Sequence, residues 1–399
     1  MYDAIVIGAR CAGSPTAMLL ARKGYRVLLV DRGSFPSDTL STHYIHQPGV
    51  ASLARWGLLE RLRASNCPPI HEQALDLGPF ALVGAPPPVD GVAEGYAPRR
   101  YVLDAILVEA AVAAGAELRE RFTVEELVWE EGRVVGIRGH AAGGAPVTER
   151  ARIVIGADGL HSFVARSVGA EAYDTTPALT CVYYTYWADL PMERAQLNPR
   201  PGRMIIAAPT NDNLTLLTVF WPQAEFHQVR ADIEGSVLAA VDLVPGLAER
   251  VRAGKRAERF RGTADLPNFF RTPYGPGWAL VGDAGFHKDP ILAQGITDAF
   301  RDAELLTEAI DAGFSGRAPL AEAFAAYQRQ RDEAAAPGFA TTLQFAQLHP
   351  PPPELQQLLG ALRQNPAQLS RFLGTMAGSV PPQEFFAPEN LGQIMAAAA

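Results

Sequence analysis

The 399-residue sequence predicts an α/β protein: a domain of parallel strands and helices, interrupted by a mainly antiparallel β-sheet and followed by a helical segment. Three observations predict it. Apolar runs near residues 4, 153 and 278 each lead into a glycine with an acid in or close after the turn. Residues 171–272 contain strand-forming runs, and the chain from about 318 is Ala-rich and helical in pattern.

The first apolar run predicts a nucleotide site. Residues 4–7 suit a buried parallel strand, and a helix is expected over 12–23. Gly8 allows the tight turn between them, and Gly13 lets the helix approach the strand. The next strand ends at Asp31, whose carboxylate can accept hydrogen bonds from ribose hydroxyls. We therefore expect a dinucleotide here, with its pyrophosphate at the helix N-terminus.

One position departs from the usual G-x-G-x-x-G pattern, because Arg10 stands at the middle glycine. That glycine normally lets the backbone approach the phosphates. The Arg10 side chain therefore either lies beside the phosphates or points away from them.

Two later motifs extend the pattern, Asp158-Gly159 after one apolar run and Gly282-Asp283 after the other, the second followed by residues 290–295. In this order the motifs resemble the class A flavoprotein monooxygenases, the p-hydroxybenzoate hydroxylase-like group, within the wider glutathione-reductase-type FAD oxidoreductases. The resemblance covers most of residues 1–310. It implies a three-layer Rossmann-like FAD domain with an inserted, mainly antiparallel substrate-binding sheet.

The resemblance also implies roles for single residues. Asp158 lies near the FAD pyrophosphate and the nicotinamide cofactor, and Asp283 binds the ribityl chain. The helix that opens at Gly295 faces the pyrimidine edge of the flavin. Arg100, four residues before an Asp, contacts the phosphates or the ribityl chain, and Arg99 competes for this position. The residues expected at FAD are Gly8, Arg10, Ala12, Gly13, Asp31, Arg32, Arg100, Val124, Asp158, Gly159, Gly282, Asp283, Pro290, Gly295 and Ile296.

The order of elements predicts three parts. A discontinuous FAD-binding domain is expected over 1–75, 97–170 and 274–317, a substrate-binding β-sheet domain over 76–96 and 171–273, and a C-terminal helical cap over 318–399.

Composition excludes several classes of protein. The net charge of −8 argues against nucleic acid as a partner. Three scattered cysteines without a C-x-x-C pair predict neither a metal site nor a disulfide framework, so we expect a reducing cytoplasm. No apolar run reaches 18 residues, so no membrane span is expected. Asp3 directly precedes the first strand, so a signal peptide is not expected.

The resemblance implies an FAD-dependent monooxygenase. NADH or NADPH reduces FAD, and dioxygen then gives a flavin 4a-hydroperoxide that oxygenates a hydrophobic, aromatic or polyketide-like small molecule of secondary metabolism. We expect a monomer or homodimer. His43 and His46 are candidate acid–base residues, because relatives run this stretch beside the flavin ring; local packing is the competing interpretation. His287 is either a flavin contact or an ordinary loop residue.

Three other functions compete. A reductase of isolated double bonds, similar to geranylgeranyl reductases, shares the FAD motifs but carries a Tyr-x-Trp-x-Phe-Pro motif that this sequence lacks. A flavin-dependent halogenase carries Trp-x-Trp-x-Ile-Pro and a catalytic lysine, and neither pattern is visible. The third is a flavoprotein without turnover.

Overall fold

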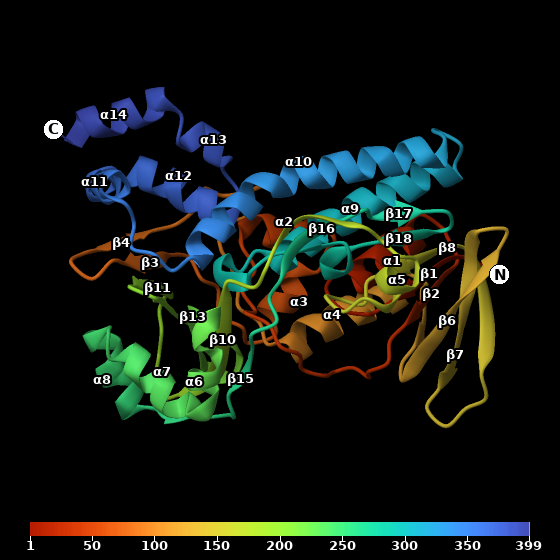
Figure 1. The fold of residues 1–399 in the computed structure, drawn as a ribbon, viewed down its shortest axis with the longest axis horizontal. Helices are drawn as coiled ribbons and strands as arrows, with labels where there is room; N and C mark the ends of the chain where they lie inside the picture. Colours follow the sequence, from red (N-terminus) through yellow and green to blue (C-terminus); the bar gives the residue numbers. More distant parts are fainter. Residues whose placement is uncertain (399) are drawn as a thin grey trace.

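The computed structural model describes residues 1–398, and its first sheet carries the predicted parallel strands. The strand order is β17-β18-β8-β1-β2-β5, with β1 parallel to both β2 and β8. Figure 1 shows this sheet beside helices α1, α4 and α9. The bounds are β1 Tyr2–Ile7, β2 Val27–Val30, β5 Glu117–Arg119, β8 Val147–Gly156, β17 Tyr274–Gly275, β18 Trp278–Leu280, α1 Gly13–Arg22, α4 Arg100–Ala113 and α9 Gly295–Phe314.

Strand alternation in β1 builds three layers. Successive side chains of a strand point to opposite faces. Ala4 and Val6 therefore pack with the helices, while Ile5 and Ile7 pack against the hairpin of β6 (Phe122–Glu130) and β7 (Arg133–Ala141). Helices, parallel sheet and hairpin form three layers, and a three-layer domain is what the sequence predicts for this part of the chain.

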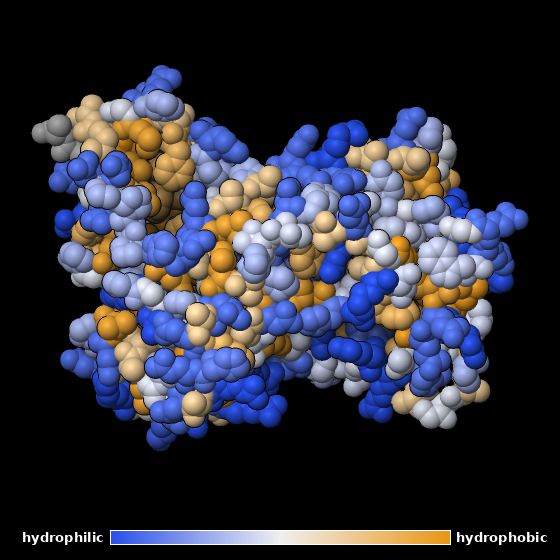
Figure 2. Space-filling view, in the orientation of Figure 1, coloured by the Kyte–Doolittle hydropathy of each residue, from blue (hydrophilic) through white to orange (hydrophobic). Residues whose placement is uncertain are grey.

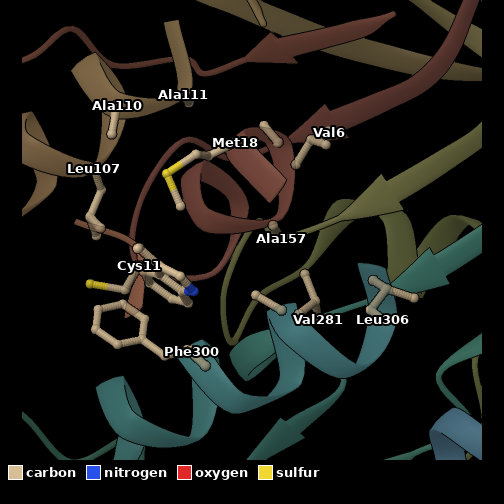
Figure 3. Close-up of a cluster of buried hydrophobic side chains, with 14 of the residues drawn as sticks. Val6, Cys11, Met18, Leu107, Ala110, Ala111, Ala157, Val281, Phe300 and Leu306 are labelled. Carbon is tan, nitrogen blue, oxygen red and sulfur yellow. The ribbon is translucent and has the colours of Figure 1, made fainter. Parts of the chain in front are cut away.

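The core on the helical side fixes α1 against the sheet. Met18 of α1 is fully buried, and Figure 3 shows it between β1 and the α4 residues Leu107 and Ala110. Burying an apolar side chain of this size contributes about 1.5–3 kcal/mol. Phe300 of α9 joins the same core, so the two helices that begin at glycine-containing turns are held by one packed cluster.

A second sheet has the order β14-β10-β13-β12-β11-β3-β4, with β15 also paired to β10. It is antiparallel except for β11 with β3. A small third sheet has the order β19-β16-β9. The bounds are β3 Gln73–Asp76, β4 Ala81–Gly84, β9 Ala172–Thr176, β10 Thr180–Ala188, β11 Ala195–Arg200, β12 Arg203–Pro209, β13 Thr215–Pro222, β14 Lys255–Arg256, β15 Arg261–Thr263, β16 Asn268–Arg271 and β19 Phe286–His287.

The C-terminal segment is helical, as predicted. The 27-residue α10 (Leu320–Ala346) packs along α9, and four shorter helices follow the proline run. These are α11 Pro353–Leu362, α12 Pro366–Ala377, α13 Pro382–Phe385 and α14 Pro388–Ala398. Figure 2 shows apolar residues gathered over these helices, where Phe386 and Met395 are exposed.

Some expected elements differ from the structure. The sequence pattern predicts one strand over 117–128, but the structure divides it at Arg121, which has a φ of 51° and turns the chain from β5 into β6. The sequence also predicts a helical segment over about 47–59. In the structure this segment stops before Gly57, which has a φ of 76°, and two helices result, α2 (Gln47–Arg55) and α3 (Leu59–Arg63).

The strand-rich interpretation of 171–272 was wrong for residues 226–253. Three helices lie there, α6 (Phe226–Ala231), α7 (Ile233–Val241) and α8 (Pro245–Ala253). Local signals mark them, since Asp232 caps α7 by accepting from the Gly235 N–H and Pro245 opens α8. These short helices cover the face of the second sheet that is turned away from the Val182 and Tyr184 side chains.

Candidate functional site

One cavity of about 840 Å³ lies where the parallel strands of the first sheet end. Strands β1, β8 and β18 run into the three glycine-containing motifs at their carboxyl ends, the usual ligand side of such a sheet. Of the residues expected at FAD, Gly8, Arg10, Ala12, Asp31, Arg32, Arg100, Val124, Asp158, Gly159, Gly282, Asp283, Pro290, Gly295 and Ile296 line the cavity. The structure therefore brings together motifs more than 250 residues apart in sequence.

Gly13 does not line the cavity but makes its phosphate end possible. A Cβ at Gly13 would lie 1.7 Å from the Gly8 carbonyl oxygen, so only glycine fits there. Gly8 itself has a φ of 102°, a conformation that glycine adopts readily. Among the described residues, no side chain caps α1 and no acid stands in its first turn. Its free N–H groups can therefore bind an anion.

Asp31 braces this turn. Its carboxylate accepts hydrogen bonds from the Ala9 N–H and the Gly33 N–H, both at 2.7 Å. Because the side chain also lines the cavity, it can fix the loop and face a ribose together.

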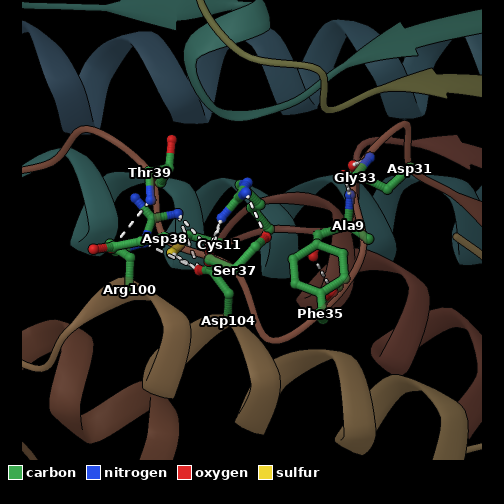
Figure 4. Close-up of polar contacts among 12 residues, drawn as sticks. Ala9, Cys11, Asp31, Gly33, Phe35, Ser37, Asp38, Thr39, Arg100 and Asp104 are labelled. Atoms are coloured by element: carbon green, nitrogen blue, oxygen red, sulfur yellow. Dashed lines mark hydrogen bonds and ion pairs between the residues drawn. The ribbon is translucent and has the colours of Figure 1, made fainter. Parts of the chain in front are cut away.

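Arg10 and Arg100 share one carboxylate, that of Asp104, whose side chain is fully buried. Figure 4 shows Arg100 and Asp104 in contact. Arg10 also donates to the Ser37 carbonyl oxygen and hydroxyl. Burial by itself disfavours the charged guanidinium, but Asp104 holds the pKa of Arg100 above its usual value. Two cations against one anion leave positive charge at the cavity, which suits a phosphate ligand.

Arg100, not Arg99, occupies the cavity wall. Arg99 instead pairs with Asp38 and Glu258 and lies over the ring of Tyr186, 3.7 Å from its centroid. Arg99 precedes α4 with non-helical backbone, whereas Arg100 is the first residue of the helix, so the two side chains leave the chain in different directions.

Asp158 holds the loop after β8. One carboxylate oxygen accepts from the Phe163 and Val164 N–H groups at the start of α5 (Phe163–Ser167), while Ser162 caps the same helix. Within residues 1–398 the other oxygen is buried without a hydrogen-bond partner. Burial raises the pKa of Asp158. Such an atom calls for a donor from a ligand or an ordered water.

The turn before α9 completes the cavity. Asp283 is exposed to it, and in the described part of the chain no donor or cation is bonded to its carboxylate. Ala293 has a left-handed φ of 52°, and Gly295 opens α9 without a side-chain cap among residues 1–398. Two uncapped helix ends, two arginines and a free carboxylate fit the phosphates and hydroxyls of FAD.

The histidines proposed for acid–base chemistry lie behind the cavity wall. His43 is fully buried; its Nδ1 is 2.6 Å from the Ser41 carbonyl oxygen, and its Nε2 accepts from the Tyr186 hydroxyl. A carbonyl only accepts, so Nδ1 carries the proton. Burial, with help from Arg100, lowers the pKa of His43 to about 3.

His46 is held in the same way. Its Nε2 donates to the Leu292 carbonyl oxygen at 2.9 Å, and burial lowers its pKa to about 4. Neither His43 nor His46 lies among the described residues that line the cavity. Their position supports local packing over the acid–base hypothesis, because a general base must reach the proton it removes.

The apolar wall of the cavity contains Tyr184, one of the aromatic residues that the sequence places alternately on the two faces of its strand. Val182 and Tyr184 of β10 line it together with Leu266, Phe286 and Tyr44. Alternation in β10 carried this signal: Tyr183 faces α6–α8 and Tyr184 faces the cavity. Lys288 also lines the cavity, but its ammonium is bonded to Gln294 and, at 2.9 Å, to Asp298.

Among residues 1–398 there is no group of three histidine, cysteine or acidic side chains able to hold a metal ion. No described helix is long and apolar enough to cross a membrane.

Comparisons with known proteins agree with this geometry. Digeranylgeranylglycerophospholipid reductase 1 of Methanopyrus kandleri is 28% identical over 311 residues, which cover 75% of this chain and 77% of that protein. The myxobacterial chondrochloren halogenase CndH has the same fold, with a TM-score of 0.80 at 21% identity over 99% of this chain and 97% of that one. PqsL, a probable FAD-dependent monooxygenase from Pseudomonas aeruginosa, has a TM-score of 0.71 at 20% identity over 94% of this chain and 99% of that one.

The match to a protein family is broader. A family model described as an FAD binding domain matches residues 1–339, which contain every residue expected at FAD. The chain belongs to this FAD-binding family and is an FAD-dependent oxidoreductase.

Proposed function

We propose that the chain is a class A-type, FAD-dependent monooxygenase that uses NADH or NADPH and dioxygen on a hydrophobic, aromatic or polyketide-like small molecule. The observation that carries the proposal is the cavity itself. It runs without interruption from the phosphate-binding turn at Gly8 to an apolar wall that contains Tyr44, Tyr184 and Phe286. The cationic end suits a cofactor and the aromatic end suits a substrate.

Different residues bind different parts of FAD. The α1 N-terminus, Gly8 and Arg100 hold the pyrophosphate, Asp31 binds a ribose and Asp283 binds the ribityl chain. Bound FAD supplies hydride acceptance and oxygen activation, which side chains alone do not offer. The second sheet covers the cavity and excludes water from the reaction. We expect the enzyme to work in the cytoplasm as a monomer or homodimer.

A second candidate is a reductase of isolated double bonds. It is favoured by the reductase from Methanopyrus kandleri, which aligns over three quarters of the chain. The halogenase alternative is weaker. The lysines of the sequence are Lys23, Lys255 and Lys288, and the one at the cavity has its ammonium engaged by Asp298.

The test separates the three activities. Purified holoenzyme is supplied with NADH or NADPH and a panel of phenols, polyketides and polyprenyl lipids, in air and under nitrogen, with and without bromide. Product mass then decides. A monooxygenase adds one oxygen from labelled dioxygen only in air, a reductase adds two hydrogens under nitrogen, and a halogenase needs the halide. A product two hydrogens heavier that forms without oxygen would overturn the proposal.

A further inference from the structure

His287 is fixed in the cavity wall by three contacts. It lies in β19, opposite Phe269 of β16, and its ring stacks on that of Phe269 with centroids 6.0 Å apart. Its Nδ1 is bonded to the Pro267 carbonyl oxygen. Because a carbonyl only accepts, Nδ1 carries the proton in the neutral ring, and Nε2 presents a lone pair.

The Nε2 atom is free and reachable. Within residues 1–398, Nε2 of His287 has no hydrogen-bond partner and is not among the buried polar atoms that lack one. The residue is 9% exposed and lines the cavity.

The other nearby histidines differ in this respect. His43 has both ring nitrogens bonded to protein groups, and His46 lies behind the wall. His161 stands at the mouth, 74% exposed, with its Nε2 3.0 Å from Asp265. Among the described histidines, His287 alone combines a fixed ring with an open nitrogen in the cavity wall.

We propose that His287 is a catalytic residue whose Nε2 accepts the proton of an acidic hydroxyl, a phenol or an enol, on the substrate. The inference rests on the proposed function and narrows its substrate class. In this step the substrate O–H bond breaks, its electron pair stays on oxygen, and the proton forms the Nε2–H bond of an imidazolium. The resulting oxyanion makes the adjacent carbon electron-rich, as oxygenation requires. After the reaction the proton returns to the product oxygen or to water.

Charged neighbours set how easily this imidazolium forms. Asp289 follows in the chain, and its carboxylate favours the cation when ionised; burial raises the pKa of Asp289 to about 6. Lys288 precedes it, and from β16 Arg271 lies over the Phe269 ring at 4.1 Å. These two cations repel positive charge on the ring, whereas the Asp289 carboxylate attracts it.

The test uses a ligand that reports its own ionisation. Oxidised holoenzyme, without NADH or NADPH, is titrated with 4-nitrophenol below the pH at which this phenol ionises in water. Nitrobenzene, which lacks the hydroxyl, is the matched ligand. The key variant is His287→Asn, because its amide can still donate to the Pro267 carbonyl oxygen but places nothing at the Nε2 position. His227→Asn, at an exposed site on α6, is the control.

The wild type and His227→Asn should show the nitrophenolate absorption on binding, whereas His287→Asn should bind the neutral phenol at least tenfold more weakly. Nitrobenzene should bind all three proteins alike. If His287→Asn loses FAD or folds poorly, His287→Gln, which keeps the side-chain volume near Nε2 but does not titrate, replaces it. Absence of bound phenolate in the wild type, or a phenolate signal in both His287 variants equal to that of the wild type, overturns the role of His287. Oxygen incorporation that persists in that case leaves the monooxygenase proposal standing.

Discussion

At the scale of single residues, Asp283 is the acid of the cavity best placed to meet a ligand. Asp31 is bonded to two backbone N–H groups, Asp104 to two arginines, and one oxygen of Asp158 to the start of α5. In the part of the chain that the structure describes, the Asp283 carboxylate has no such partner and faces the cavity. Its hydrogen-bonding capacity is therefore available to the cofactor.

Asp283→Ala should weaken FAD binding without unfolding the protein. Loss of a charge-assisted hydrogen bond costs about 1.5–3 kcal/mol, or roughly tenfold or more in affinity. Fluorescence titration of apoprotein with FAD measures the dissociation constant. Asp283→Asn, which keeps an acceptor, should lose less. An unchanged constant in a folded Asp283→Ala variant would contradict the ribityl assignment.

We expect His46 to make the stability of the protein sensitive to acid and to have no catalytic role. Its folded pKa of about 4 lies below the usual 6.5, so the unfolded chain binds the proton more readily. The contribution of His46 to the free energy of unfolding is thus fully present above about pH 6.5. It is lost as the pH falls toward 4, at up to about 1.4 kcal/mol per pH unit. Lys288 opposes and Asp298 favours its protonation.

His46→Gln should keep a donor for the Leu292 carbonyl oxygen and remove the titration. Urea unfolding measures the free energy of unfolding at pH 7 and at pH 5. Between these two pH values it should fall by about 1–2 kcal/mol less in His46→Gln than in the wild type. His227→Gln, at an exposed site, serves as the control and should follow the wild type. Equal losses in His46→Gln and the wild type would refute the assignment.

At the scale of elements, the two helices that open onto the cavity use glycine for different reasons. In α1, Gly13 packs so closely on the turn that a Cβ would meet the Gly8 carbonyl oxygen. In α9, a Cβ at Gly295 would meet no described atom within 4 Å, because it would stand in the cavity. The first glycine serves the fold, and we expect the second to leave room for the cofactor.

Paired alanine substitutions separate these reasons. Gly13→Ala should destabilise the apoprotein by more than about 3 kcal/mol, since backbone must move. Gly295→Ala should leave the melting temperature of the apoprotein within a few degrees, yet weaken FAD binding at least tenfold. Gly392→Ala in α14, where a Cβ also has open space, should change neither quantity. Normal FAD affinity in Gly295→Ala would remove the α9 N-terminus from the cofactor site.

At the scale of the whole molecule, Arg331 joins the long helix α10 to the third sheet and the cofactor turn. Its side chain is fully buried and donates to the Gly285 carbonyl oxygen at 3.1 Å, the Arg271 carbonyl oxygen at 3.0 Å and the Tyr173 hydroxyl at 2.7 Å. Asp332 balances its charge. Gly285 stands two residues after Asp283, so α10 supports the turn that faces the cavity.

Arg331→Met should therefore destabilise the protein by about 3 kcal/mol or more, because it leaves buried acceptors without donors. It should also weaken FAD retention, since the Gly282–Gly285 turn loses its support. Arg329→Met, at an exposed site on the same helix, should stay within about 0.5 kcal/mol of the wild type. Urea denaturation and the FAD content of purified protein report both effects. Equal stability of the two variants would show that α10 does not brace the turn.

The fold class and the set of turns that meet at the cavity follow from the sequence. Local patterns carry this information, because a buried strand that ends in Gly8 or Gly282 signals its own geometry within a few residues. The tertiary structure decided what individual side chains do. Arg10 finds Asp104 across 94 positions, and His43 finds Tyr186 across 143. The sequence named His43 and His46 as acid–base candidates, but packing buried both and left the Nε2 of His287 open. Burial and partners of this kind arise only when distant segments pack together, so no local pattern encodes them.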